Sequence, residues 1–107
     1  MDPRVRYNEV ADDLAAQNDN VVLGQMMGMP AIKRAGKMIG GFSNDEGAMV
    51  FKVPDEAVRE RALALDGAHL FDPSGGRRAP MKEWVVVPAA HAANWAKLAE
   101  QALRHPA

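Results

Sequence analysis

The sequence predicts an α+β domain in which three helices pack against a five-stranded antiparallel sheet, in the order α-β-β-β-β-α-β-α. Four short apolar runs lie between residues 21 and 53, with turn residues separating them. Apolar residues recur at three- and four-residue spacing before and after this stretch, which is the period of an amphipathic helix. The connections between the runs are too short for parallel crossovers, so the strands are expected to be antiparallel.

The first helix is predicted from Pro3 to about Gln17. Asp2 is a favourable N-cap acceptor, and proline is favoured at the first helical position. The predicted buried stripe of this helix comprises Tyr7, Val10, Ala11, Leu14 and Ala15. The run Asn18-Asp19-Asn20 is expected to end the helix, because short polar side chains hydrogen-bond their own backbone and favour turns.

Five strands are predicted, at residues 21–27, 31–34, 37–42, 48–53 and 82–87. Gly36 can supply the positive φ of a hairpin turn between the second and third strands, and Gly47 can do so between the third and fourth. Because side chains alternate across a strand, Met38 and Phe42 are expected on the face opposite Ile39.

The rest of the chain is predicted to form two further helices around a loop. The helices are expected at residues 54–66 and 89–104, and the loop at residues 69–78. Trp84 on the fifth strand and Trp95 on the last helix are expected to lie buried in the same layer, between the sheet and the helices.

Composition indicates one domain, residues 1–107, and excludes several kinds of chemistry. The chain is 48% hydrophobic and 25% charged, as ordinary globular proteins are, and its net charge is −1. It has no cysteine, which excludes disulfides, thiolate metal sites and cysteine nucleophiles. No apolar run approaches the roughly 20 residues that span a bilayer, and the charged N-terminus is unlike a signal peptide. The expected location is the cytoplasm, with no membrane partner.

Both faces of the predicted sheet carry apolar side chains, whereas a sheet with one wet face should alternate between apolar and polar residues. In the fourth strand Met49, Phe51 and Val53 share one face, and Val50 lies on the other. The surplus face has three candidate covers, namely the 69–81 loop, a second copy of the chain, or a ligand. Met38, Met49 and Phe51 are the residues expected at or near the contact of a homodimer.

Several segments resemble the N-terminal domain of the TfoX/Sxy family, proteins associated with the regulation of bacterial competence, and more distantly the YjbR-like proteins. The matching segments are Gly24–Gly28, Gly36–Gly41, Met49–Val53, Leu70–Pro73 and Met81–Pro88, followed by the helix with Trp95. The likeness covers roughly residues 5–104. The chain departs from the family at Met27, where phenylalanine is usual, and at Ile39, where an aromatic residue is usual.

The resemblance implies an α+β domain similar to the secretion-chaperone fold. It brings no established enzymatic activity and no catalytic residues. Full-length competence regulators have a second, C-terminal domain that this sequence does not include, so a role in competence does not transfer to this chain.

The residues themselves point away from catalysis. The chain has no threonine, and its only serines, Ser43 and Ser74, lie beside turns without a nucleophile motif. Its histidines, His69, His91 and His105, are too widely spaced in the sequence to suggest a metal site. No enzymatic activity, cofactor or metal is therefore predicted.

The one segment with the composition of an anion-binding loop comprises Ser74, Gly75, Gly76, Arg77 and Arg78, with Lys82 close behind. Glycines let backbone N–H groups approach an anion, and arginines hold phosphate or carboxylate. A solvated loop is the competing interpretation.

The sequence thus predicts a small non-enzymatic interaction or regulatory module whose partner is a second copy or another protein. The alternative is a nucleic-acid-associated regulatory protein, in which the basic groups at Lys33–Lys37 and Arg77–Lys82 form one patch. The acidic first helix and the net charge of −1 count against this alternative.

Overall fold

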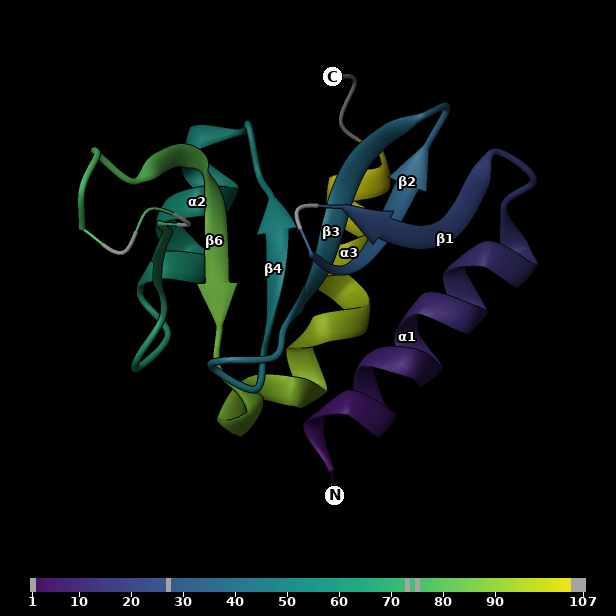
Figure 1. Ribbon diagram of the computed structural model, residues 1–107, viewed down its shortest axis with the longest axis horizontal. Helices are drawn as coiled ribbons and strands as arrows, with labels where there is room; N and C mark the ends of the chain where they lie inside the picture. Colours follow the sequence, from purple (N-terminus) through teal and green to yellow (C-terminus); the bar gives the residue numbers. More distant parts are fainter. Residues whose placement is uncertain (1, 27, 73, 75, 105–107) are drawn as a thin grey trace.

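The computed structural model describes residues 2–26, 28–72, 74 and 76–104, which form an α+β domain with a six-stranded antiparallel sheet (Figure 1). The elements in chain order are α1 (Pro3–Gln17), β1 (Val21–Met26), β2 (Met29–Arg34), β3 (Lys37–Ser43), β4 (Ala48–Lys52), α2 (Glu56–Leu63), β5 (His69–Phe71), β6 (Met81–Val87), a 3-10 helix η1 (Ala89–Asn94) and α3 (Trp95–Arg104).

The helix starts follow from local capping. The Asp2 carboxylate accepts a hydrogen bond from the Arg4 backbone N–H at 2.9 Å, so α1 has its predicted bounds and cap. Helix α2 begins at Glu56 rather than at Pro54, because Asp55 is the N-cap and accepts from the Val58 N–H at 3.0 Å.

The sheet order is β1-β2-β3-β4-β6-β5. The predicted meander is confirmed from β1 to β4, and β6 then pairs with the outer side of β4. The prediction of five strands was wrong, because His69–Phe71 forms β5 against β6 where a loop was expected. Three residues are too few to show a period of two in a sequence, so pairing with β6 reveals this strand where composition did not.

A bulge in β3 changes which of its side chains share a face. Ile32 pairs with Gly40 and the next residue, Lys33, pairs with Met38, so Ile39 is an extra residue on β3. Beyond the bulge the alternation is offset by one position. Phe42 therefore lies on the same side as Ile39, and its predicted placement beside Met38 was wrong.

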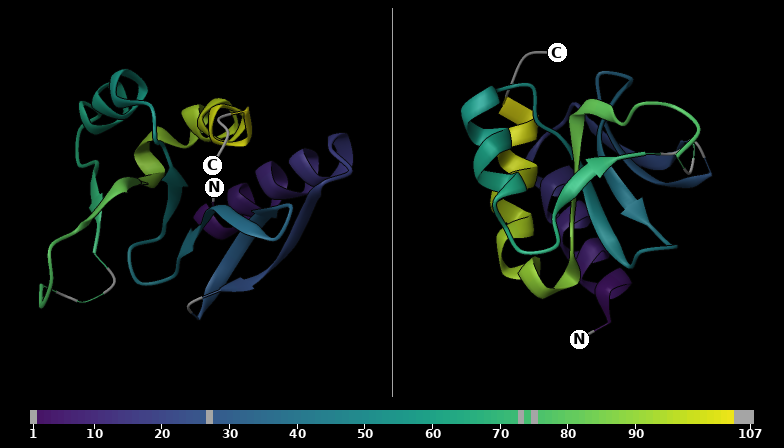
Figure 2. Two further views of the ribbon diagram at one scale, coloured as in Figure 1. Left: turned by 90° about the horizontal axis from the view of Figure 1, so that it is seen from above. Right: turned by 90° about the vertical axis from the view of Figure 1, so that its left-hand side faces the viewer.

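The three helices lie along one side of the curved sheet, and the ends of the sheet bend away from them (Figure 2). The helix-side core contains Met49, Phe51 and Val53 as predicted, with Trp95 at 0% exposure. A second buried group, here called the second-face cluster, lies on the other side of the sheet. Its buried members are Met29, Ala31, Met38, Ala48, Val50, Phe71 and Val86, with Met26, Met81 and Trp84 packed against them.

The two tryptophans lie on opposite faces of the sheet, so their predicted common layer was wrong. The Trp95 indole N–H donates to the Val87 carbonyl at 3.2 Å in the helix-side core, and partly buried Trp84 belongs to the second-face cluster. The last helix also differs from its prediction, because η1 precedes α3 and His91 has non-helical dihedrals of φ −109° and ψ 25°. Within the described ranges, no helix is long and apolar enough to cross a membrane.

Candidate functional site

The residues expected at a dimer contact do not lie at a surface. Met49 and Phe51 are 0% exposed in the helix-side core, and Met38 is 6% exposed in the second-face cluster. A second copy docking on the folded chain cannot reach Met49 or Phe51. The prediction that Met49 and Phe51 lie at or near a dimer contact was therefore wrong, because the helices cover their face of the sheet.

The chain itself covers the buried part of the second face. A Cβ built on Gly41 would lie 2.8 Å from Met38 Cε, 2.9 Å from Met29 Cε and 2.7 Å from the Pro30 carbonyl oxygen, so the two thioether side chains fold directly over this glycine. Of the three candidate covers of the surplus face, cover within one chain accounts for these buried residues. The partly exposed side chains that remain on this face are Met26, Met81 and Trp84.

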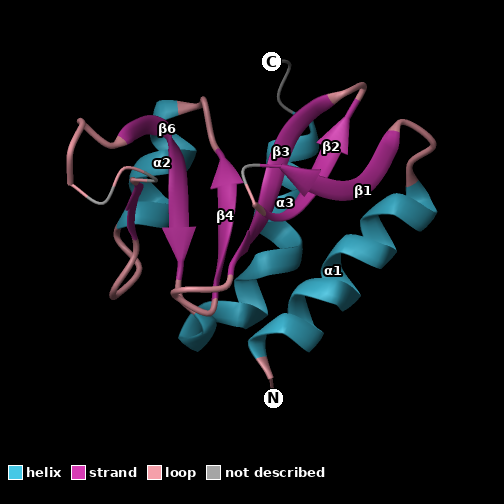
Figure 3. Ribbon diagram, viewed as in Figure 1, coloured by secondary structure: helices cyan, strands magenta, loops and turns pink. Residues whose placement is uncertain are grey.

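Strand β1 presents the main apolar feature that is exposed. It is the terminal strand of the sheet and pairs only with β2 (Figure 3). Its burial pattern is one buried residue, four exposed residues and one intermediate residue, and Val22 and Leu23 are 61% and 38% exposed. Helix α1 therefore covers the start of the strand at Val21 and leaves the next four residues open.

The register shows which backbone groups of β1 point outward. The Ala35 N–H donates to the Asn20 carbonyl at 3.0 Å, which identifies that pair as hydrogen-bonded. Hydrogen-bonded pairs alternate along an antiparallel ladder, so Val22 and Gly24 also bond to β2. The N–H and C=O groups of Leu23 and Gln25 consequently point away from β2, towards the free edge.

The devices that usually protect a strand edge are missing from β1. Natural edge strands carry lysine, proline or bulges, or they are very short. From Asn20 to Ile32 the chain has no charged residue, and β1 itself has no proline and pairs in continuous register over six residues. This combination favours the addition of another strand.

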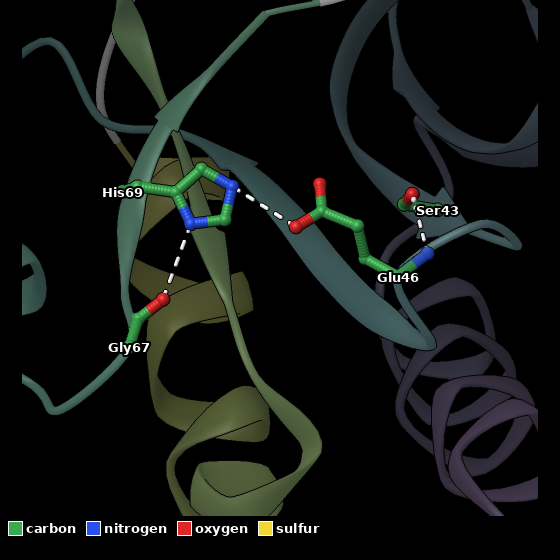
Figure 4. Close-up of polar contacts among 4 residues, drawn as sticks. All are labelled: Ser43, Glu46, Gly67 and His69. Atoms are coloured by element: carbon green, nitrogen blue, oxygen red, sulfur yellow. Dashed lines mark hydrogen bonds and ion pairs between the residues drawn. The ribbon is translucent and has the colours of Figure 1, made fainter.

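The opposite edge, β5, is built differently. It has three residues, and its first, His69, is held on both sides (Figure 4). The His69 Nε2 atom lies 3.0 Å from a Glu46 carboxylate oxygen, and Nδ1 lies 3.1 Å from the Gly67 carbonyl oxygen. The Glu46 backbone N–H in turn donates to the Ser43 hydroxyl at 3.3 Å, so the contact ties β5 to the turn between β3 and β4.

The candidate anion-binding loop folds around its own carboxylate. The Asp72 side chain accepts from the Ser74 N–H at 2.9 Å, from the Ser74 hydroxyl at 2.5 Å and from the Gly76 N–H at 2.8 Å. These hydrogen bonds, with that of the hydroxyl the largest, hold the pKa of Asp72 below its ordinary value of 3.8. The N–H groups expected to bind an external anion are thus occupied by Asp72. Gly75 lies outside the described residues, and the cationic residues of the segment, Arg77, Arg78 and Lys82, are exposed.

The two basic groups do not form one patch. The turn between β2 and β3, which carries Arg34 and Lys37, and the connection that carries Arg77 and Arg78 lie at opposite ends of the molecule (Figure 1). The expectation that Lys33–Lys37 and Arg77–Lys82 combine was therefore wrong. The sheet separates them, because β2–β3 and β5–β6 lie on either side of β4.

A hollow of about 700 Å³ adjoins the first basic group, lined by Gln17, Asn18, Asn20, Arg34, Ala35, Lys37, Glu100, Leu103 and Arg104. Two of its three basic side chains, Arg34 and Arg104, have neighbouring partners. Arg34 donates to the Leu103 carbonyl at the end of α3, and Arg104 lies 4.0 Å from Glu100. The Arg34 contact positions the β2–β3 turn against α3.

The serines and two of the histidines, His69 and His91, have structural partners, and His105 lies outside the described residues. Ser74 donates to Asp72 and accepts from the Arg78 N–H at 2.9 Å, while the His91 Nε2 atom lies 2.8 Å from the Asp66 carbonyl oxygen. Neither serine forms a hydrogen bond with a histidine in the part of the chain that the structure describes. In the same residues, no group of three or more histidine, aspartate or glutamate side chains could hold a metal ion.

Comparison with known proteins adds no relative, since no family model, curated protein or solved structure matches the chain. The TfoX-like reading rests on the sequence segments alone. The site that sequence reasoning missed is the β1 edge. Two features of the sequence could have indicated this edge. The chain has no charged residue from Asn20 to Ile32. The strand in this run also follows a helix, so only one strand is its neighbour in the sequence.

Proposed function

We propose that this protein is a small non-enzymatic interaction module, similar to the TfoX N-terminal domain and to the secretion-chaperone fold, which acts in the cytoplasm by binding protein partners. The observation that carries the proposal is the open edge of β1, with outward backbone groups at Leu23 and Gln25 and exposed apolar side chains at Val22 and Leu23. Strand addition at such an edge gains main-chain hydrogen bonds and buries apolar surface together.

The end of β1 on the second face supports the same proposal. Met26, the last residue of β1, is partly buried against the second-face cluster. Methionine side chains adapt to different partners because they are flexible and polarizable. A partner strand on β1 therefore has one adaptable apolar side chain, Met26, at the end of the edge.

The alternative, a nucleic-acid-associated regulatory protein, has weaker support. Its two basic groups lie at opposite ends of the sheet, so each would have to bind separately. Titration of a labelled duplex at low and moderate salt tests it, because phosphate contacts weaken steeply as salt rises. Tight, salt-sensitive binding would replace the interaction-module proposal.

The proposal is tested by capturing partners with the immobilised wild type and with two lysine variants. Val22→Lys places a charge on the β1 edge, at a side chain that is 61% exposed. Val5→Lys is the matched control, because Val5 is 48% exposed on α1, away from the edge. We expect Val22→Lys to lose partners that Val5→Lys retains. Equal capture by all three proteins would show that the β1 edge is not the binding surface.

A further inference from the structure

We propose that the partner of the β1 edge is the β1 edge of a second copy, paired antiparallel around a two-fold axis through Leu23, so that the two sheets become one continuous sheet. This inference rests on the proposed function, because it names the partner of the same edge. It adds the identity of the partner, the register in which the two strands pair, and the residue, Leu23, that pairs with Leu23 of the other copy on the axis.

The register follows from symmetry and from the outward backbone groups. A two-fold axis normal to a continuous sheet places residues of the same face opposite one another, so paired positions are an even number apart. The free backbone N–H groups of β1 are those of Leu23 and Gln25, because the Val21 N–H donates to the Asn18 carbonyl at 3.1 Å and leaves only the Val21 carbonyl facing outward. An axis through Leu23 pairs Leu23 with itself and brings each Gln25 N–H to the Val21 carbonyl of the other copy. An axis through Val22 leaves Gln25 without a partner in the strand, and an axis through Gly24 brings together the two Lys33 ammonium groups that lie over Gly24.

The side chains of β1 fit this register. On the second face, Val22 comes opposite Gly24 of the other copy, and Gly24 has no side chain to oppose it. The nearest atom to a Cβ built on Gly24 is the Lys33 Nζ, at 3.7 Å, and this flexible ammonium group can move. On the helix side, where Leu23 pairs with Ile32 of the helix-side core, the two Leu23 side chains meet. The exposed apolar side chains Val22 and Leu23 are thus both covered, one on each face of the joined sheet.

Charge favours a second copy over a basic partner. No charged residue lies between Asn20 and Ile32, so pairing β1 with itself places no like charges directly opposite each other. A basic partner strand would find no counter-charge in β1 and would meet the Lys33 ammonium group that lies over Gly24. Pairing of β1 with β5 of another copy is a head-to-tail contact that builds open filaments, whereas pairing of β1 with β1 closes at two copies.

The area available predicts a weak dimer. One six-residue strand and its neighbouring side chains make an interface at or below the small end of specific complexes, about 1,200 Å² in total. We therefore expect a mass that rises with concentration, from 11.6 kDa towards about twice that value, over micromolar to millimolar protein in sedimentation equilibrium.

The decisive test uses the self-pairing of Leu23, which is 38% exposed and so tolerates substitution in the monomer. Leu23→Lys alone and Leu23→Glu alone place like charges opposite each other, and each should remain monomeric. An equimolar mixture should associate again, because lysine of one copy then meets glutamate of the other. Val22→Lys mixed with Val22→Glu should recover less, since Val22 faces Gly24 and the two substituted side chains are only diagonal neighbours. Val5→Lys should dimerise as the wild type does.

Each other outcome overturns the inference. A wild type that stays at 11.6 kDa up to millimolar concentration, while Val22→Lys loses captured partners, keeps the proposed function and rejects the second copy as partner. A dimer unaffected by Leu23→Lys, association that grows beyond two copies, or no recovery in the Leu23 mixture rejects this pairing. Amide hydrogen exchange tests the same pairing in the wild type, so its result does not depend on whether a variant folds. The Leu23 and Gln25 N–H groups should exchange more slowly at high concentration, and unchanged rates in a demonstrated dimer would also reject it.

Discussion

Replacing each tryptophan with phenylalanine in turn tests the assignment of the two cores. Trp95 is 0% exposed and its indole N–H donates to the Val87 carbonyl, so Trp95→Phe removes part of a buried ring system and one hydrogen bond to that carbonyl, which also pairs with Met49 of β4. Trp84 is partly buried on the second face, where the sheet has no helix over it. The same substitution should therefore have very different consequences at the two positions.

The magnitude for Trp95→Phe follows from two contributions. Truncating a buried tryptophan to alanine costs about 3–5 kcal/mol, of which phenylalanine recovers a large part. The lost indole hydrogen bond is worth about 0.5–1.5 kcal/mol, because the carbonyl keeps its pairing with β4. We expect Trp95→Phe to lower the free energy of unfolding by about 1.5–3 kcal/mol, a large fraction of the ~5–15 kcal/mol typical of a domain. Trp84→Phe should cost about 1 kcal/mol or less.

Urea unfolding followed by far-ultraviolet circular dichroism measures the difference. With a slope of about 1–1.5 kcal/mol per molar urea for a small domain, Trp95→Phe should lower the midpoint by about 1–3 M. Each variant also keeps one tryptophan as a fluorescent reporter. Trp95, left alone in Trp84→Phe, should resist acrylamide quenching, and Trp84 should be quenched more readily. Equal losses of stability, or the reverse order of quenching, would refute the assignment of Trp95 to the helix-side core and Trp84 to the second face.

Three further measurements test other contacts. Gly41→Ala should lower the free energy of unfolding, measured in urea, by about 1–3 kcal/mol, because the new Cβ would lie 2.7 Å from the Pro30 carbonyl oxygen. Gly24→Ala is the control and should cost far less, because the nearest atom to its Cβ is 3.7 Å away. Similar losses in the two variants would contradict the packing at Gly41. Burial, the largest cause, raises the pKa of Tyr7 to about 12 from 10.0, so its contribution to stability is complete below pH 10 and is lost as the pH rises towards 12. A shift of two pKa units is worth at most about 2.7 kcal/mol, and less where solvent reaches the phenol oxygen. Tyr7→Phe should therefore reduce the loss of stability between pH 10 and pH 12. An unchanged dependence of stability on pH would show that Tyr7 is not the source of this loss. The pKa of Asp72 in the folded protein lies below 3.8, so the Gly76 N–H should be protected from hydrogen exchange above pH 3.8 and should lose this protection as the pH falls through the folded-state pKa. Asp72→Asn should weaken the protection at neutral pH. Full protection in the variant would contradict the loop geometry.

The features that the sequence determined by itself depend on neighbouring residues. Asp2 before Pro3 places a capping carboxylate and a fixed φ at the start of α1, and the helix begins there. Gly36, with φ +82°, forms the β2–β3 turn as predicted. The alternation of Met49, Phe51 and Val53 on one face of β4 also held, because this strand pairs without interruption. These are effects of a few adjacent residues, which a sequence shows directly.

The features that only the tertiary structure decided depend on what lies beside each strand. Ile39 is the extra residue of a bulge because the pairing of β3 with β2 shifts by one residue there, and that single residue moves Phe42 to the other face. The three residues of β5 become a strand only because β6 lies next to them. Val22 and Leu23 read as ordinary buried strand residues in the sequence, and they are exposed because β1 ends the sheet. Strand order sets which apolar residues reach solvent, and strand order is a long-range property that local periodicity does not contain.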